Sequence, residues 1–180
     1  MIEFLQKRKS RRFYLDKPVE KEVIEKLVQA ALLSPSSRNL HPWDFIIVQD
    51  KGMIEKLAAS KIHGSSFLKD APLAVVILGN SDKSDVWIED SSIAAILIQL
   101  EAESLGLGSC WVQIRNRKHS EEETAGDYIR GVMELPMNYH VECVIAVGYS
   151  DEKRESASLE ELDYSRVHNE KLGIPYREED

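Results

Sequence analysis

The sequence has few cysteines and no long apolar run. Its 180 residues include two cysteines, Cys110 and Cys143, too few for a disulfide framework and without the paired spacing of a zinc site. The longest apolar runs, such as residues 73–79, are much shorter than a bilayer span, and the N-terminus lacks the apolar core of a signal peptide. We therefore expect a cytoplasmic protein in a reducing compartment, with no membrane partner.

The sequence also has fewer basic than acidic residues. Acidic residues number 31 against 23 basic ones, for a formal net charge of −8, which repels nucleic acid and anionic membranes. Any anion that binds must be held by a local basic cluster. The five histidines are scattered without ligand spacing, so no metal centre is expected.

Apolar periodicity predicts alternating helices and strands within one domain, residues 1–180. The predicted strands cover residues 43–48, 73–78, 109–114 and 141–149. The first two predicted helices run from the first turn at Pro18 to about Leu33 and over residues 53–60. A third, mostly buried helix covers residues 88–105 and is ended by Gly106. A fourth is capped near Ser120 and has Glu121, Glu122 and Glu123 in its first turn. This pattern favours an α+β fold with a central mixed β-sheet flanked by helices.

The segment 151–180 is charged and has scattered apolar residues, so it cannot form a core of its own. We expect it to lie on another surface.

A basic cluster stands out near the N-terminus. Arg8, Lys9, Ser10, Arg11 and Arg12 place four cations and a hydroxyl within five residues of an otherwise acidic chain. Guanidinium groups and a hydroxyl match the charge and geometry of a phosphate monoester. A solvated basic patch is the alternative interpretation.

A polar loop between a predicted helix and strand is the second candidate. Residues 34–43 crowd hydroxyls, an amide and two prolines together, and such a loop can hydrogen-bond the edge of a flat heteroaromatic ring. An ordinary turn is the alternative, because the same residue types are common in loops. Trp43 suits either the core or a cofactor contact.

Three segments, taken in their order along the chain, resemble those of a known family. RKSRRF at residues 8–13, SPSSRNLHPWDF at 34–45 and EAESLGLGSCWVQ at 101–113 resemble the nitroreductase family of FMN enzymes, with further similarity at 70–78, 135–153 and 163–173. The resemblance implies a nitroreductase-like fold, FMN at the interface of a homodimer, and a tail from 151 to 180 that extends onto the partner subunit. It also implies hydride transfer from NADH or NADPH to a small electron-poor acceptor, such as a nitroaromatic or a quinone, by a ping-pong mechanism.

The resemblance also assigns cofactor-binding residues. The FMN phosphate and ribityl chain are expected at Arg8, Lys9, Ser10 and Arg12, with Lys153 as a further phosphate contact. The partner subunit's loop is expected to lie against the ring through Pro35, Ser36, Ser37 and Asn39. Backbone donors near flavin N5 are expected from Trp111, Val112 and Gln113. Many relatives have glutamate at the last position, and a backbone N–H serves with either residue. The flavin carries the chemistry, so no catalytic side chain is assigned.

Other functions stay open. Some members of the family bind or remodel flavin or dehalogenate substrates. The local GSCW sequence around Cys110 also resembles the nucleophile segment of papain-like proteases, but 70 residues follow Cys110, too few for the histidine spacing of that class. Gly106 and Gly108 end a helix and lack a third glycine, which argues against a dinucleotide fold.

Overall fold

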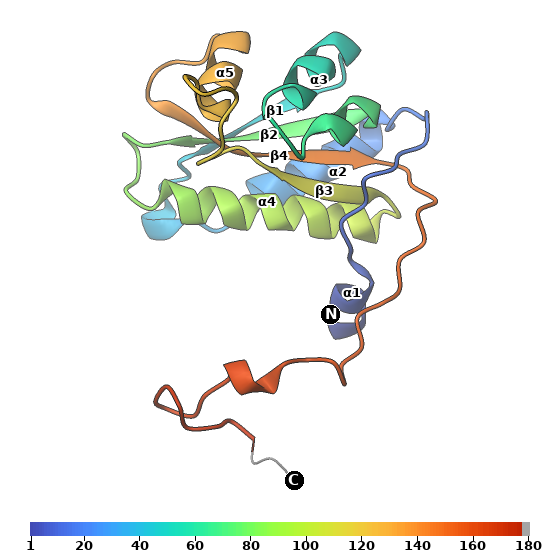
Figure 1. Cartoon of the computed structure of the whole chain (residues 1–180), viewed down its shortest axis with the longest axis vertical. Coiled ribbons are helices and arrows are strands. Elements are labelled where there is room, and N and C mark those ends of the chain that lie inside the picture. The colour runs from blue at the N-terminus through green and yellow to red at the C-terminus, as the bar shows by residue number, and fades with distance from the viewer. Residues whose placement is uncertain (178–180) are drawn as a thin grey trace. The chain divides into compact units, whose positions relative to one another are not determined.

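The structure is a computed structural model that describes residues 1–177, so the last three residues of the predicted tail lie outside the described residues (Figure 1). It contains two compact units. One unit is Lys9–Lys153, and the other combines Met1–Arg8 with the chain from Arg154 onward. Every strand and most helices belong to Lys9–Lys153.

The sheet of this unit has four strands in the order β1-β2-β4-β3. They are β1 (Trp43–Val48), β2 (Leu73–Asn80), β3 (Gly108–Gln113) and β4 (Tyr139–Gly148). All three neighbouring pairs are antiparallel, so the prediction of a mixed sheet was wrong. Val48 at the end of β1 pairs with Ala74 at the start of β2, because the connecting segment returns to the same end of the sheet. Helix and strand alternation does not reveal that return.

Helices cover both faces of the sheet. Figure 1 shows α3 (Lys51–Ala58) and α5 (Ala125–Val132) on one face, and α2 (Lys21–Leu32) and α4 (Trp87–Ser104) on the other. All eight residues of β2 are buried, as its continuous apolarity predicted. Alternate side chains point to opposite faces. Val76 therefore packs with the α3 and α5 side, and Ile77 with the α2 and α4 side.

Helix α2 begins later than predicted. Its N-cap is Glu20, whose carbonyl accepts from the amides of Val23 and Ile24, so Pro18 precedes the helix and is not in its first turn. Leu27 and Ala31 are buried, whereas Leu32 at the helix end is 56% exposed in this chain.

Helix α4 is buried on one side. Ala95, Ile98 and Ala102 pack against the sheet, while Ile93 and Ile96 point outward and are 41% and 38% exposed. The prediction of a mostly buried helix therefore holds for its inner face. Gly106 has a φ of +75°, a left-handed conformation that glycine adopts without strain, and it follows the helix as predicted.

Helix α5 starts at Ala125, not near Ser120. Thr124 is its N-cap, and its Oγ1 accepts from the Asp127 amide at 3.0 Å. The Ser120 hydroxyl instead accepts from the amides of the two glutamates that follow Glu121, which forms a turn before the helix. The prediction that Glu121, Glu122 and Glu123 form the first turn of the helix was therefore wrong. Ser120 and Thr124 are both suitable caps and lie within five residues, and the helix starts after Thr124.

The second unit contains α1 (Ile2–Lys7) and the short 3₁₀ helix η3 (Tyr164–Arg166). Gln6 and Ala157 join its two segments by two hydrogen bonds, 2.7 Å from the Gln6 side chain and 2.9 Å from the Ala157 amide. None of its described residues is buried. Across residues 1–177, no helix combines the length and apolarity needed to cross a membrane.

Candidate functional site

The basic segment after Arg8 runs beside the outer edge of β3. Ser10 forms a parallel bridge with Ser109, and the Arg11 amide donates to the Ser109 carbonyl at 2.9 Å. Because β3 is an edge strand, this contact covers the beginning of its free edge. This contact brings Ser10 and Arg12 next to the strand that carries Cys110.

Cys110 lies inside this arrangement and is 1% exposed. Burial raises the pKa of its thiol, and Glu152 raises it further, while the positive charge of Arg12, a hydrogen bond from Ser10 and the charge of Lys61 oppose the rise. The sulfur therefore stays a thiol at neutral pH. Cys110 is the packed strand residue that its chain context predicted.

Two further cations belong to the same neighbourhood, because the charge of Lys61 acts on the Cys110 thiol together with that of Arg12, and the charge of Arg117 acts on Lys61. Burial lowers the pKa of Lys61, and the nearby positive charge of Arg117 lowers it further. The Arg12 guanidinium lies 5.8 Å from the centroid of the Phe67 ring. We call Arg12, Lys61 and Arg117 the cationic cluster.

Sequence reasoning missed Lys61 and Arg117, because each belongs to a segment that is distant in sequence from Arg12. The Ile62 amide donates to the Lys118 carbonyl at 3.3 Å and joins these two loops. No local pattern signals such a contact.

A carboxylate already contacts the basic segment. The Arg12 amide donates to Glu152 Oε2 at 3.0 Å, and the Arg11 guanidinium donates to the Glu152 carbonyl oxygen. A backbone N–H in this segment therefore engages an anionic group. Lys153 follows Glu152 and is exposed at the end of the Lys9–Lys153 unit, whereas Arg8 belongs to the other unit. Lys9 is half-buried.

Strand β3 presents Trp111 and Gln113 on one face and Cys110 and Val112 on the other. The Trp111 indole donates to Gln113 Oε1 at 2.8 Å, and Gln113 Nε2 donates to the Arg115 carbonyl at 2.9 Å, so the Gln113 amide is engaged at both ends.

Backbone direction along β3 follows from the contact at Ser109. The Ser109 carbonyl faces away from β4, because it accepts from Arg11. In an antiparallel strand, the N–H and C=O of one residue point to the same side, and successive residues alternate sides. The backbone groups of Trp111 and Gln113 therefore point outward, and those of Val112 point toward β4.

The second candidate segment is a strained loop that contains the 3₁₀ turn η1 (Ser37–Asn39). Arg38, Asn39 and His41 have φ values of 52°, 56° and 45°. Left-handed conformations are unfavourable for residues with a side chain and persist where surrounding contacts enforce them. The Ser36 hydroxyl accepts from the His41 amide at 2.9 Å, and the Ser37 amide donates to Asp90 Oδ1 at 2.9 Å. Of the predicted loop residues, Ser36 and Ser37 are half-buried, and Pro35 and Asn39 are exposed.

Trp43 belongs to the core in this chain. It is 8% exposed, and its ring centroid lies 5.0 Å from that of His41 and 5.3 Å from that of Phe45. Its indole nitrogen has no hydrogen-bond partner among residues 1–177. The structure thus favours packing over cofactor contact for this side chain.

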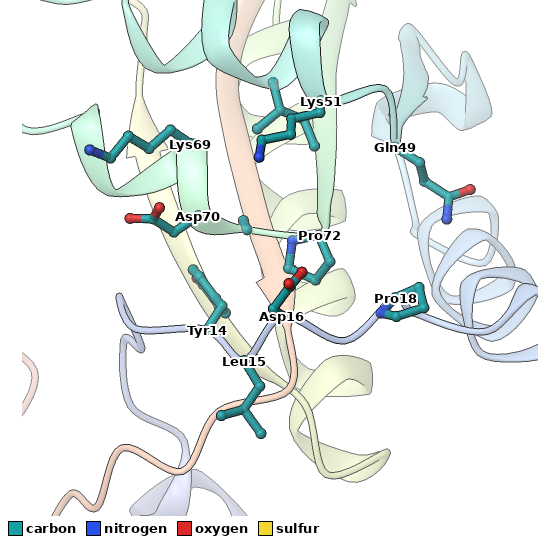
Figure 2. A pocket seen from close by; sticks show the side chains of 11 residues that line it. Tyr14, Leu15, Asp16, Pro18, Gln49, Lys51, Lys69, Asp70 and Pro72 are labelled. Carbon is teal, nitrogen blue, oxygen red and sulfur yellow. The ribbon is translucent and has the colours of Figure 1, made fainter.

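A cavity of about 480 Å³ lies at the end of the sheet where β1 ends and β2 begins (Figure 2). Tyr14, Asp16, Lys51, Lys69 and Asp70 line it, together with proline and aliphatic side chains. It contains none of the predicted site residues. Its two ammonium groups are matched by two carboxylates, so it lacks the excess positive charge that a phosphate requires.

The sequence was compared with protein families and with known proteins. The nitroreductase family model matches residues 5–64 and 55–149. The chain belongs to the nitroreductase family. A solved FMN-dependent nitroreductase from Clostridium difficile R20291 is 50% identical and has a TM-score of 0.94, with 95% of this chain and 99% of that chain covered.

Two curated relatives extend the comparison. A protein of Archaeoglobus fulgidus, described provisionally as an NADH dehydrogenase/NAD(P)H nitroreductase, is 33% identical over 94% of this chain and 97% of its own length. An iodotyrosine deiodinase of Thermotoga neapolitana is 25% identical over 86% of this chain and 90% of its own length. The nitroreductase-like α+β fold is therefore confirmed.

Proposed function

We propose that this member of the nitroreductase family is an FMN-dependent oxidoreductase that passes hydride from NADH or NADPH to a small electron-poor acceptor. The observation that carries the proposal is the placement of the basic segment along the edge of β3, where Ser10 bridges Ser109 and the Arg11 amide donates to Ser109, in a protein of net charge −8. The charges of Arg12 and Lys61 both act on the neighbouring Cys110 thiol, and Arg117 acts on Lys61. A local excess of cations in an acidic chain favours a specific anion over general attraction.

The phosphate of FMN fits this cluster by charge and by donor type. Arg12 offers a planar fork of donors, Ser10 a hydroxyl, and Lys61 an ammonium group, which together match the charge and the acceptor oxygens of a phosphate monoester. The contact of Glu152 with the Arg12 backbone amide supports the fit, because it shows that this segment also offers a backbone donor to an anionic group. Arg8, Lys9 and Lys153 are proposed as additional contacts.

The outer edge of β3 suits the flavin ring. The outward backbone N–H groups of Trp111 and Gln113 are available for a ligand, and the alternation favours Gln113 over Val112 as the donor near N5. FMN, when bound, would supply the redox chemistry that links the nicotinamide to the acceptor. The chain's part is to bind and orient the cofactor with fixed donors and to exclude water.

A homodimer would complete the site. On α4, the exposed Ile93 and Ile96 and the half-buried Leu97 and Leu100 recur at the i, i+3, i+4, i+7 spacing that gives a helix one apolar face. A partly exposed apolar stripe of this kind is typical of an interaction surface. We propose that two copies pair through it and that Pro35, Ser36, Ser37 and Asn39 of one subunit contact the flavin of the other.

The tail has the same need for a second surface. In the unit formed by residues 1–8 and 154–177, none of the residues is buried. Even the apolar side chains Leu5, Leu159 and Leu162 are 45%, 49% and 48% exposed. We propose that residues 151–180 extend onto the partner subunit within a single-domain protomer. The cytoplasmic location stays a prediction.

Absorption spectroscopy of the reconstituted protein tests this function. We expect flavin bands after incubation with FMN, bleaching of those bands by NADH or NADPH under anaerobic conditions, and FMN on chromatography of the heat-released cofactor. Finding FAD, or no flavin retained after reconstitution, would contradict the proposal. Donor and acceptor should use one site in turn, so steady-state kinetics with a quinone should give parallel double-reciprocal lines. Intersecting lines would contradict the shared site.

Reductive dehalogenation is the second candidate, supported by the relative that is named an iodotyrosine deiodinase. Turnover of an iodinated tyrosine with release of iodide, and no turnover of a nitroaromatic or a quinone, would favour it over the reductase function.

A further inference from the structure

Asp90 is a buried carboxylate in the first turn of α4, and it is 4% exposed. One oxygen, Oδ1, accepts from the backbone amide of Ser37 at 2.9 Å. The other oxygen, Oδ2, has no hydrogen-bond partner among residues 1–177. A buried carboxylate is costly, and the N-terminal end of a helix is where its negative charge is best tolerated. The contact with Ser37 thus links a rigid helix to the strained loop.

The loop needs such an anchor. Arg38 and Asn39, which follow Ser37 directly, both have left-handed φ values and are not glycine. The hydrogen bond from His41 to Ser36 lies within the loop, so it shapes the loop without attaching it to the scaffold. A strained conformation of this kind persists when a fixed external group enforces it.

The second attachment is weaker. Arg38 pairs with Asp85, but their side chains are 61% and 79% exposed. Exposed ion pairs contribute little, because water and salt screen them. A charge-assisted hydrogen bond from a backbone amide to a buried carboxylate is stronger. Asp90 is therefore the dominant attachment of the loop to α4.

We propose that Asp90 is a positioning residue of the flavin site, which holds the loop with Ser36, Ser37 and the left-handed Asn39 in the conformation that meets the cofactor. The inference rests on the proposed function, since that function gives the loop its role. Asp90 need not touch the flavin. It acts through the Ser37 amide, so an acceptor oxygen at its position is the main requirement, and the negative charge strengthens that hydrogen bond further.

The test compares three variants of the full chain. Asp90→Ala removes the acceptor, Asp90→Asn keeps a side-chain oxygen that can accept from Ser37, and Ser91→Ala alters a neighbouring buried polar residue whose hydroxyl donates to the Leu78 carbonyl instead. We expect Asp90→Ala to raise the dissociation constant of FMN at least about tenfold, the scale of a lost hydrogen bond to a charged group. Asp90→Asn should stay within about threefold of the parent protein, which corresponds to less than half that change in free energy. Ser91→Ala should match the parent.

A second readout separates this inference from the proposed function. Hydrogen exchange of the Ser37 amide, measured by NMR in flavin-free protein, should be faster in Asp90→Ala than in the parent and slow again in Asp90→Asn. If the parent binds no FMN, the proposed function fails, and the positioning role fails with it. If the parent binds FMN but Asp90→Ala binds it equally well, or keeps Ser37 protected, Asp90 is not a positioning residue. Should Asp90→Ala not fold, Asp90→Ser, whose hydroxyl is too short to reach the loop, takes its place under the same criteria.

Discussion

The cationic cluster and the strained loop differ in how they are built. The cluster consists of side chains from three segments: the charges of Arg12 and Lys61 act on the buried Cys110 of β3, and that of Arg117 acts on Lys61. The loop contributes few charges, and its special feature is the backbone conformation at Arg38, Asn39 and His41. A phosphate needs cations, whereas the edge of a flat ring needs fixed donors and acceptors in the correct places. The difference suits the two ends of one cofactor.

This contrast predicts how each region responds to substitution. Truncating a side chain should damage the cluster, because charge is what it supplies. The loop should tolerate changes to its exposed side chains and respond to changes that release its backbone.

The largest effect is expected from Arg12→Ala. Loss of a charged hydrogen-bond donor should weaken FMN binding by about 1.5–3 kcal/mol. Titration of flavin fluorescence measures the change. Arg38→Ala is the matched control, because the exposed pair of Arg38 with Asp85 lies in the loop and should contribute less than about 1 kcal/mol. Equal losses in the two variants would remove the distinction between the regions.

A smaller effect with a specific pH dependence is expected at Lys61. Burial and Arg117 lower the pKa of Lys61, so the folded state binds this proton less tightly than the unfolded chain. Its charge therefore lowers the stability of flavin-free protein at neutral pH, and that loss shrinks as pH rises through the lowered pKa and is gone above the ordinary pKa of lysine. FMN affinity should change in the opposite direction, because the ammonium group is lost at high pH.

Lys61→Met should therefore stabilise the flavin-free protein at neutral pH and weaken FMN binding by roughly two- to fivefold, the scale of a partly exposed charge interaction. Thermal unfolding and FMN titration measure the two changes. Lys118→Met is the control, since Lys118 pairs with Glu121 at 3.0 Å on the surface. A Lys61→Met protein that binds FMN as tightly as the parent at all pH values would remove Lys61 from the cluster.

The smallest effect on activity is expected from Cys110→Ala. The thiol is buried and its pKa is raised, so the variant should keep FMN and most of its turnover. The lost sulfur should lower the free energy of unfolding by roughly 1 kcal/mol, as small truncations in a core do. Cys143→Ala, at a second buried position, is the control for that stability loss. Complete loss of turnover in folded, flavin-loaded Cys110→Ala protein would favour a thiol mechanism.

The sequence predicted local features better than long-range ones. The strand over Trp43–Val48 and the buried strand that begins at Leu73 follow from local apolar patterns and were placed correctly. The sheet's antiparallel order depends on where each connection returns, and that is not encoded in any single segment. The cap of α5 was misplaced because Ser120 and Thr124 are both good N-cap residues, and only the fold selects Thr124.

The same limit applies to the candidate site. Ser10 and Arg12 could be named from their motif, because the motif is contiguous. Lys61, Arg117 and Asp90 could not be named, because each acts through a contact with a segment far away in sequence. The resemblance to a family identified the loop at residues 35–39, while its strain and its anchor required the structure.

Mixed dimers test most directly whether one subunit supplies the cluster and the other the loop. Arg12→Ala and Asp90→Ala chains, each defective in FMN binding as a homodimer, are mixed by co-expression under two affinity tags. In a two-fold symmetric dimer, a mixed pair contains one doubly altered site and one intact site, so random mixing should restore about one quarter of the parent's FMN sites. Isolated mixed dimers that bind one FMN with the parent's affinity would agree with this account. Mixed dimers that bind FMN no better than either homodimer would contradict it, because the cluster and the loop would then belong to the same subunit's site.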